Sequence, residues 1–254
     1  MMNTNQNLFD VNGKTVFVTG ASSGIGRSAA TCLAVSGAKV IGIARREDKL
    51  KEWSESTEGE TSYFSADISN RKQIKNIVDE IVKIEGNPDI LINAAGLNTR
   101  EHADDVTIDG WDKTLDLNLS SPFFMAQAVV EEMKKRKWGR IINYASLTSR
   151  RALPSSIAYG ASKGGVEQLT RAMAEAWSPF GINVNAIAPG FFPTELTVPV
   201  FNDKERTIRN ANQTCIGRNG RLEDLDGPLL FLCSKSSEYV TGQLIFVDGG
   251  FTAK

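Results

Sequence analysis

The stretch TVFVTGASSGIG, residues 15–26, carries the two signals on which the fold prediction depends. Its first five residues are apolar or β-branched, as in a strand buried on both faces of a parallel sheet. Gly20, Gly24 and Gly26 follow, and then a segment of helical character from about Arg27 to Ser36. Such a turn lets the backbone approach a pyrophosphate, whose charge then lies at the helix N-terminus. Because glycines also form ordinary tight turns, the rest of the chain must support a nucleotide site.

Six more short apolar runs follow, separated by longer amphipathic segments. In the segment 71–86, Ile74, Ile77, Val78, Ile81 and Val82 recur at helical spacing, which predicts a helix with one apolar stripe. Regular alternation of strand and helix predicts an α/β fold: a single-domain, doubly wound, Rossmann-like parallel sheet of seven strands with helices on both faces. The six runs are KVIGIA (39–44), TSYFS (61–65), DILIN (89–93), RIINYA (140–145), NVNAIA (183–188) and QLIFV (243–247). No linker or repeat divides residues 1–254, so we expect one domain.

Composition narrows the classes of function. The chain is 41% hydrophobic and 23% charged, with a net charge of -1, which argues against a protein that coats nucleic acid or an anionic membrane. The basic run KKRKWGR (134–140) is better explained as the end of a long helix, where cations complement the helix dipole. The N-terminal stretch MMNTNQNLFDVNGK is polar and no run reaches membrane-spanning length, so we expect a cytoplasmic protein.

Cysteine and histidine are too few for several familiar kinds of site. Cys32, Cys215 and Cys233 are scattered and odd in number, so they imply no disulfide framework and no CxxC site. His102 is the only histidine, which leaves no zinc site of the usual type. A Ser-His-Asp hydrolase would have to use that one histidine as its base. We therefore expect no metal site.

The second strand is followed by Arg45 and Arg46. An NAD site would place Asp or Glu there to accept hydrogen bonds from the adenosine ribose. A guanidinium instead forms a paired, charge-assisted contact with a 2′-phosphate. The pair favours NADP(H) over NAD(H), which remains possible, although arginines at the start of a surface helix also serve simply to solvate it.

The motif YGASK, residues 159–163, places a tyrosine and a lysine one helical turn apart with only small side chains between them. Together with the glycine turn it resembles the short-chain dehydrogenase/reductase family, and the likeness runs nearly end to end. The family features stand in order: TGASSGIG (19–26), Asp67, NAAG (93–96) where NNAG is commoner, Asn118, Ser146, YGASK, PG at 189–190 with Thr194, and VDGG (247–250).

The resemblance implies a catalytic group of Asn118, Ser146, Tyr159 and Lys163. Tyr159 would exchange a proton with the substrate oxygen, which Ser146 would hold. A free phenol has a pKa near 10, and a neighbouring ammonium in a desolvated site stabilises the phenolate, so we expect Lys163 to lower the pKa of Tyr159. Lys163 would also hold the nicotinamide ribose. Asn118 lies in a predicted helix, in which an asparagine favours a local break. It would hold a water that links Lys163 to solvent.

The resemblance also implies the cofactor contacts. Asp67 and Asn93 would lie beside the adenine ring, and Thr194 would position the nicotinamide amide. With the two arginines, the full set is Gly20, Ser22, Ser23, Gly24, Ile25, Gly26, Arg45, Arg46, Asp67, Ile68, Asn93, Ala94, Gly96, Tyr159, Lys163, Pro189, Gly190, Phe192 and Thr194.

The substrate leaves a weaker trace in the sequence. Segment 190–220 has the length of a functional lid within a compact domain, and its Phe191 is a candidate substrate contact. Arg100, Arg150 and Arg151 are candidates for binding a carboxylate, although arginines at a subunit contact would look the same. The pattern resembles gluconate 5-dehydrogenase-like members acting on sugar acids or polyols, with 3-oxoacyl-thioester reductases as the alternative and a non-catalytic NADPH-binding sensor or scaffold as a further one. The family resemblance also implies a homotetramer.

Overall fold

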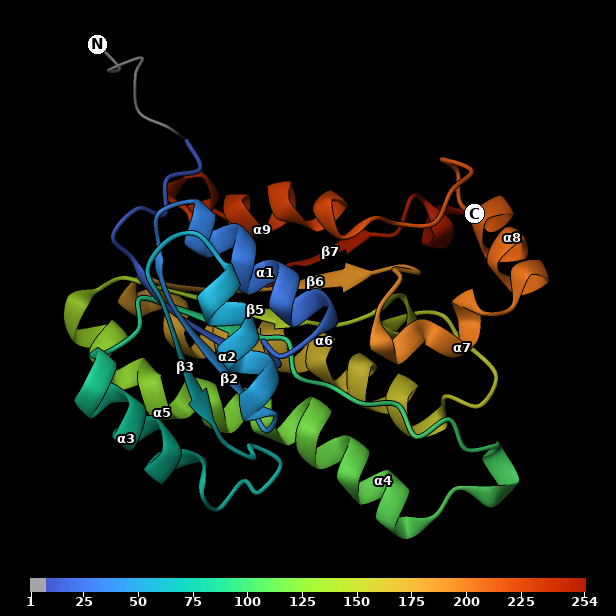
Figure 1. Ribbon diagram of the computed structural model, residues 1–254, viewed down its shortest axis with the longest axis horizontal. Coiled ribbons are helices and arrows are strands. Elements are labelled where there is room, and N and C mark those ends of the chain that lie inside the picture. Colours follow the sequence, from blue (N-terminus) through green and yellow to red (C-terminus); the bar gives the residue numbers. More distant parts are fainter. Residues whose placement is uncertain (1–7) are drawn as a thin grey trace.

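The computed structural model describes residues 8–254, in which one sheet of seven parallel strands has the order β3-β2-β1-β4-β5-β6-β7 (Figure 1). The chain winds outward from β1 in one direction and from β4 in the other, so the predicted doubly wound α/β fold is confirmed. Each strand coincides with a predicted run to within one residue at either end: β1 (Thr15–Thr19), β2 (Lys39–Ala44), β3 (Thr61–Ser65), β4 (Ile90–Asn93), β5 (Gly139–Tyr144), β6 (Ile182–Pro189) and β7 (Leu244–Val247).

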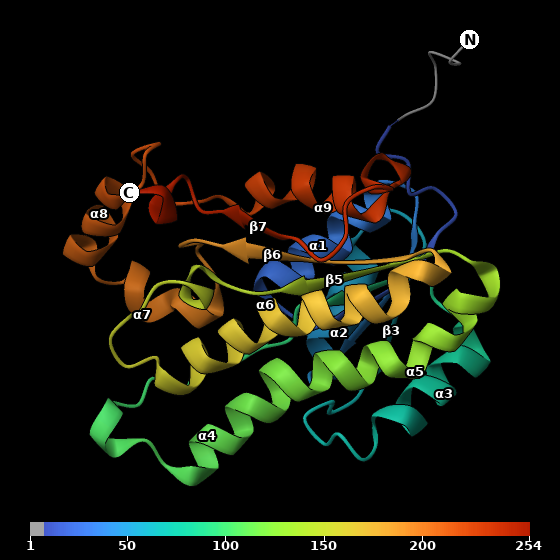
Figure 2. The ribbon, with the colours of Figure 1, turned by 180° about the vertical axis from the view of Figure 1, so that it is seen from behind.

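Helices cover both faces of the sheet (Figures 1 and 2). On one face α1, α2 and α9 share a buried cluster with strand residues such as Val16 and Val18, and on the other α3, α5 and α6 do so with Phe17. The helices are α1 (Gly24–Val35), α2 (Glu47–Ser56), α3 (Ile74–Glu85), α4 (Ile108–Leu115), α5 (Ser121–Arg136), α6 (Ile157–Trp177), α7 (Val198–Phe201), α8 (Lys204–Gln213) and α9 (Asp226–Cys233). The first helix begins at Gly24, three residues before the predicted start.

The apolar stripe predicted for residues 71–86 lies on α3 and faces the sheet. Ile74, Val78 and Ile81 are fully buried, and Ile77 and Val82 pack against the same cluster. The basic run at 134–140 is divided between two elements: Lys134, Lys135 and Arg136 form the last turn of α5, as predicted. Arg140 instead lies buried in β5.

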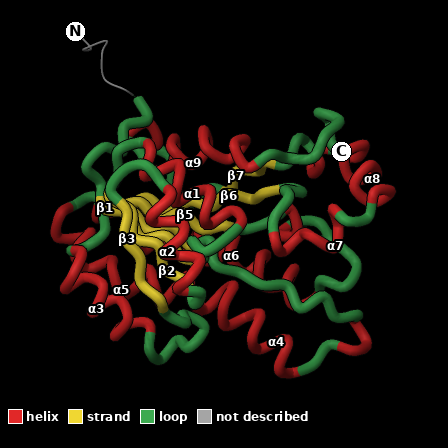
Figure 3. The backbone as a smooth tube through the Cα atoms, in the orientation of Figure 1, coloured by secondary structure: helices red, strands yellow, loops and turns green. Residues whose placement is uncertain are grey.

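Between β6 and α9 the chain leaves the sheet as a separate lobe (Figure 3). This segment, residues 190–220, was predicted as a lid-length loop, but it carries a 3-10 turn (Glu195–Thr197) and the helices α7 and α8. Its base is closed by a hydrogen bond from the Gly220 amide to the Phe191 carbonyl at 2.9 Å. The lobe therefore leaves and rejoins the body at one place.

No helix within residues 8–254 is both long and apolar enough to cross a membrane. The polar N-terminal stretch in which we expect no signal core lies half outside the described residues, because residues 1–7 are not among them.

Candidate functional site

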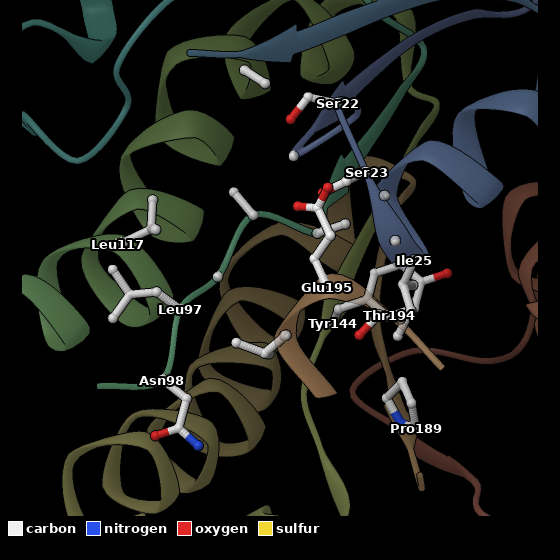
Figure 4. Close-up of a pocket in the computed structure, with 18 of the residues that line it drawn as sticks. Ser22, Ser23, Ile25, Leu97, Asn98, Leu117, Tyr144, Pro189, Thr194 and Glu195 are labelled. Carbon is white, nitrogen blue, oxygen red and sulfur yellow. The ribbon is translucent and has the colours of Figure 1, made fainter. Parts of the chain in front are cut away.

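A cavity of about 550 Å³ runs along the carboxyl edge of the sheet, where the strand order reverses between β1 and β4 (Figure 4). Open α/β sheets bind ligands at such a switch point. The walls come from the glycine turn, the ends of the central strands, two side chains of α6 and the start of segment 190–220. Of the predicted cofactor residues all except Asn93 line it: Gly20, Ser22, Ser23, Gly24, Ile25, Gly26, Arg45, Arg46, Asp67, Ile68, Ala94, Gly96, Tyr159, Lys163, Pro189, Gly190, Phe192 and Thr194.

The turn between β1 and α1 has room for a phosphate because three of its positions, Gly20, Gly24 and Gly26, carry no side chain. Gly20 and Gly24 have φ angles of +75° and +56°, in the left-handed region that favours glycine. A Cβ on Gly26 would lie 2.3 Å from the carbonyl oxygen of Gly20. The free amides at the start of α1 can therefore approach an anion closely, and the turn fits the pyrophosphate of a dinucleotide.

At the end of β2, Arg45 and Arg46 both line the cavity. The Arg46 guanidinium donates to the hydroxyl oxygens of Ser22 and Ser23, the latter at 2.7 Å. It also forms an ion pair with Glu195 at 3.0 Å. A guanidinium with hydroxyls beside it fits a phosphate monoester, so this corner suits the 2′-phosphate of NADP(H).

The Asn93 side chain lies outside the cavity. It is buried behind the cavity wall, where Nδ2 donates to the Pro122 carbonyl at 3.2 Å and to Asn143 Oδ1 at 2.9 Å. These bonds use the amide to join β4, β5 and α5. The Asn93 side chain therefore does not line the cavity, although Asn93 was predicted to lie beside the adenine ring.

Ser146, Tyr159 and Lys163 meet at the opposite end of the cavity. Ser146 lies close enough to the Tyr159 hydroxyl to lower the pKa of that phenol, and Lys163 Nζ lies 5.7 Å from the centre of the Tyr159 ring. The Lys163 ammonium donates to the Tyr144 carbonyl at 2.7 Å. The small side chains between Tyr159 and Lys163 let the loop after β5 pack closely, so that Ser149 Oγ reaches the Lys163 carbonyl at 2.7 Å.

Burial shifts the pKa of both Tyr159 and Lys163. Burial raises the pKa of Tyr159 above its ordinary value, while the hydrogen bond from Ser146 and the positive charge of Arg100 oppose this rise. The pKa of Lys163 is itself lowered by burial to about 8. That Lys163 lowers the pKa of Tyr159 stays a prediction; in this structure the Lys163 ammonium points to the Tyr144 carbonyl and is itself desolvated.

Asn118 does not line the cavity. It is fully buried in a π-helical turn, Asp116–Ser120, which forms at the place where a break in the helix was predicted. Its Oδ1 accepts from the Leu97 amide and its Nδ2 donates to the Leu97 carbonyl, both at 2.9 Å, and Nδ2 also donates to Ser162 Oγ at 3.1 Å. Asn118 thus ties the loop after β4 to α6, which carries Tyr159.

The four predicted substrate residues are separated by the fold, and none of them lines the cavity. Arg100 comes nearest: its charge acts on Tyr159, and its Nη2 donates to the Leu196 carbonyl at 2.7 Å. Arg150 forms an ion pair with Glu167 at 2.7 Å and lies over the ring of Phe246 on β7. Arg151 is exposed on the same loop, and Phe191 packs edge-on against Phe251.

Other residues at the site had no signal in the sequence that assigned them a role. Asn98 and Leu97 mark the end near α6, and the Glu195 carboxylate lies beside Ser23 at the other end (Figure 4). Asn98 is the exception, because its place in the loop after the NAAG box made it a candidate for meeting a substrate carboxylate or hydroxyls. Glu195 reaches Arg46 across 149 residues of sequence, a pairing that no local pattern predicts. Within residues 8–254 no cluster of three or more His, Cys, Asp or Glu side chains is placed to hold a metal ion.

Comparisons with known proteins agree with this geometry. A family model described as Enoyl-(Acyl carrier protein) reductase matches residues 20–252. The chain is 37% identical over 248 residues to gluconate 5-dehydrogenase of Gluconobacter oxydans, covering 96% of this chain and 97% of that one. It is 38% identical over 249 residues to 2-dehydro-3-deoxy-D-gluconate 5-dehydrogenase of Bacillus subtilis, covering 97% of each. A solved gluconate 5-dehydrogenase from Burkholderia cenocepacia, in complex with NADP and tartrate, is 35% identical with a TM-score of 0.90, covering 97% of this chain and 98% of that one.

Proposed function

This chain belongs to the short-chain dehydrogenase/reductase family, and we propose that it transfers a hydride between NADP(H) and the secondary alcohol or ketone of a sugar acid. Family membership makes it an oxidoreductase that acts on CH–OH groups with a nicotinamide dinucleotide. The observation that carries the choice of substrate is the identity of 37% and 38% to two gluconate-type dehydrogenases over nearly the full chain. Arg100 fits that class, since its guanidinium is held by the carbonyl of Leu196, which lines the cavity. A guanidinium beside the acid–base group suits a substrate whose carboxylate lies a few bonds from the reacting carbon. The two relatives are named as dehydrogenases of gluconate-type acids, which supports a sugar acid as the substrate class.

The side chains divide the proton chemistry between them. Reduction of a ketone needs a hydride on carbon, which the bound dinucleotide supplies, and a proton on oxygen. Tyr159 gives that proton, and Ser146 holds the oxygen within reach by a second hydrogen bond. Lys163 holds the nicotinamide ribose, and its burial beside Tyr159 makes the ammonium an acid with a pKa of about 8, able to return a proton to the phenolate near neutral pH. Alcohol oxidation uses the same groups in reverse.

The preference for NADP(H) over NAD(H) rests on Arg46. Its guanidinium and the hydroxyls of Ser22 and Ser23 form a corner that fits a 2′-phosphate, and the residues at the end of β2 include no carboxylate. NAD(H) would still fit the rest of the cavity, because the pyrophosphate that the glycine turn would hold is common to both cofactors.

The proposal extends to the assembly and the moving parts. We propose that residues 1–254 form one domain, supported by a sheet that takes strands from residues 15 to 247, and that segment 190–220 acts as the substrate lid, supported by the place of Phe192 and Leu196 in the cavity wall. The substrate roles of Arg150, Arg151 and Phe191 stay predictions without support from their positions. We also propose a homotetramer, by family resemblance, working in the cytoplasm, where the free thiols of Cys32, Cys215 and Cys233 stay reduced.

The deciding experiment measures NADPH consumption with 5-ketogluconate and, in parallel, with an acetoacetyl thioester. Turnover of the sugar acid with little turnover of the thioester is the expected result. Rapid turnover of the thioester alone would establish the alternative, a 3-oxoacyl-thioester reductase, toward which the description of the family model points. Tight NADPH binding without turnover across a broad panel of carbonyls and alcohols would indicate a non-catalytic sensor or scaffold.

A further inference from the structure

The Arg46 side chain already holds an anion from its own chain. Its Nη1 lies 3.2 Å from Glu195 Oε1 and 3.0 Å from Oε2. Its other two nitrogens donate to Ser22 Oγ, with Nε at 3.3 Å and Nη2 at 3.1 Å, and Nη2 also donates to Ser23 Oγ. All three guanidinium nitrogens are therefore engaged, two by hydroxyls and one by a carboxylate.

Hydroxyls and a carboxylate respond differently to an incoming phosphate. A serine hydroxyl can rotate and donate its own hydrogen to a phosphate oxygen, so Ser22 and Ser23 can share Arg46 with that group. A carboxylate only accepts hydrogen bonds and carries a like charge, so Glu195 must release Arg46 or remain as a repulsive neighbour. Of the three partners, Glu195 alone competes with a 2′-phosphate.

Glu195 is presented by an ordered turn. It opens the 3-10 turn Glu195–Thr197, in which Thr197 Oγ1 accepts from the Thr194 amide at 2.9 Å. The next residue, Leu196, is held through its carbonyl by Arg100. Both sides of the turn are anchored, so the carboxylate is held toward Arg46 at little further cost in conformational entropy.

We propose that Glu195 is a specificity-determining residue for the cofactor: its carboxylate occupies Arg46 as an internal substitute for the 2′-phosphate and so weakens the preference for NADP(H). The inference rests on the proposed NADP(H) site and adds a residue to it. NAD(H) has no 2′-phosphate and leaves the Glu195–Arg46 pair intact, whereas NADP(H) has to break it. Because the pair is exposed to solvent, its effect on the ratio of the two affinities is about three- to fivefold, the upper part of the range for exposed ion pairs.

The test measures the Kd of NADP⁺ and of NAD⁺ by titration calorimetry for the wild type, Glu195→Gln, Arg46→Gln and the double variant. Glu195→Gln should raise the affinity for NADP⁺ relative to NAD⁺ at least threefold, and this gain should vanish in the Arg46→Gln background. Glu205→Gln is the matched control, because Glu205 is an exposed carboxylate in the same segment that does not line the cavity. It should leave both constants unchanged.

Three results would overturn the inference, and they are distinguishable. A gain below threefold in Glu195→Gln, with Arg46→Gln still weakening NADP⁺, removes the role of Glu195 and leaves the proposed NADP(H) preference standing. A gain that persists without Arg46 shows that Glu195 does not act through that guanidinium. Unchanged NADP⁺ binding in Arg46→Gln removes the proposed cofactor preference itself, and the role of Glu195 with it.

Discussion

The two ends of the cavity are built in different ways. At the nucleotide end the shape depends on the backbone: a Cβ on Gly26 would lie 2.3 Å from a carbonyl oxygen, and the walls are ends of paired strands. At the substrate end it depends on side chains that reach segments far along the chain, as Arg100 reaches Leu196 at 2.7 Å. The backbone geometry of a turn can be predicted from neighbouring residues, whereas a contact between distant residues cannot. The glycine turn is therefore general to dinucleotide sites, whereas the substrate end and the long-range Arg46–Glu195 pair are specific to this protein.

The largest effect is expected at Tyr159, at the substrate end of the cavity. Tyr159→Phe keeps the ring and its packing but removes the hydroxyl that gives the proton, so kcat should fall by about a thousandfold or more. Calorimetric binding of NADPH should stay within about threefold of the wild type. A variant that keeps most of its turnover would show that another group donates the proton.

A variant of Lys163 tests whether burying this catalytic ammonium lowers the free energy of unfolding. The pKa of its ammonium is lowered to about 8 from an ordinary 10.5, so the folded state binds this proton less tightly than the unfolded state. The cost is therefore fully present below pH 8 and disappears as pH rises to about 10.5. Lys163→Met should be inactive, yet more stable at pH 7 by up to about 3 kcal/mol, less the lost bond to Tyr144.

Urea unfolding of the wild type and Lys163→Met at pH 7 and pH 9.5 measures this effect. The difference in unfolding free energy between the two proteins should shrink at the higher pH. A difference that does not change between these pH values would mean that the folded and unfolded chains bind the Lys163 proton equally.

Gly26 tests the claim that the nucleotide end depends on the backbone. Gly26→Ala forces a Cβ against the Gly20 carbonyl, so we expect a loss of about 2 kcal/mol in stability and at least about tenfold weaker NADPH binding. Gly227→Ala is the control, since a Cβ there meets nothing within 4 Å. It lies in α9 and should be neutral or slightly stabilising. Equal behaviour of the two variants would remove the steric argument.

Arg100 and Arg150 sharpen the description of the substrate end, because sequence alone ranks them together. Arg100→Met should raise the KM for a sugar acid about tenfold and leave the KM for an uncharged polyol within about twofold. Arg150→Met should change neither KM by more than about twofold, because its guanidinium pairs with Glu167, away from the cavity. The reverse ranking would transfer the carboxylate site to the loop after β5.

Prediction from sequence succeeded where one segment determines the outcome. The strands, the stripe on α3 and the glycine turn all follow from neighbouring residues, and so does the meeting of Ser146, Tyr159 and Lys163 once the fold is known. It failed where partners are distant. The motif around Asn93 indicated an adenine contact, but a buried bond to Asn143 on β5 holds that side chain away.

Electrostatics were the hardest to anticipate. Spacing alone brings the Lys163 ammonium near the Tyr159 ring, but it cannot show that the Tyr144 carbonyl takes up this ammonium or that the charge acting on Tyr159 comes from Arg100. Both depend on how three separate loops converge on one cavity.

The lobe between β6 and α9 is closed at its base by the hydrogen bond between Gly220 and Phe191, and it also contacts the body through Arg46 and Arg100. Its two ends are neighbours, so a homologous insert of different length can be grafted there at a small cost in loop-closure entropy and without altering strand register. New substrate ranges in this architecture can thus arise by replacing one piece of chain while the glycine turn and the strands stay unchanged, although Thr194 and Glu195, which line the cofactor cavity, would be replaced with it.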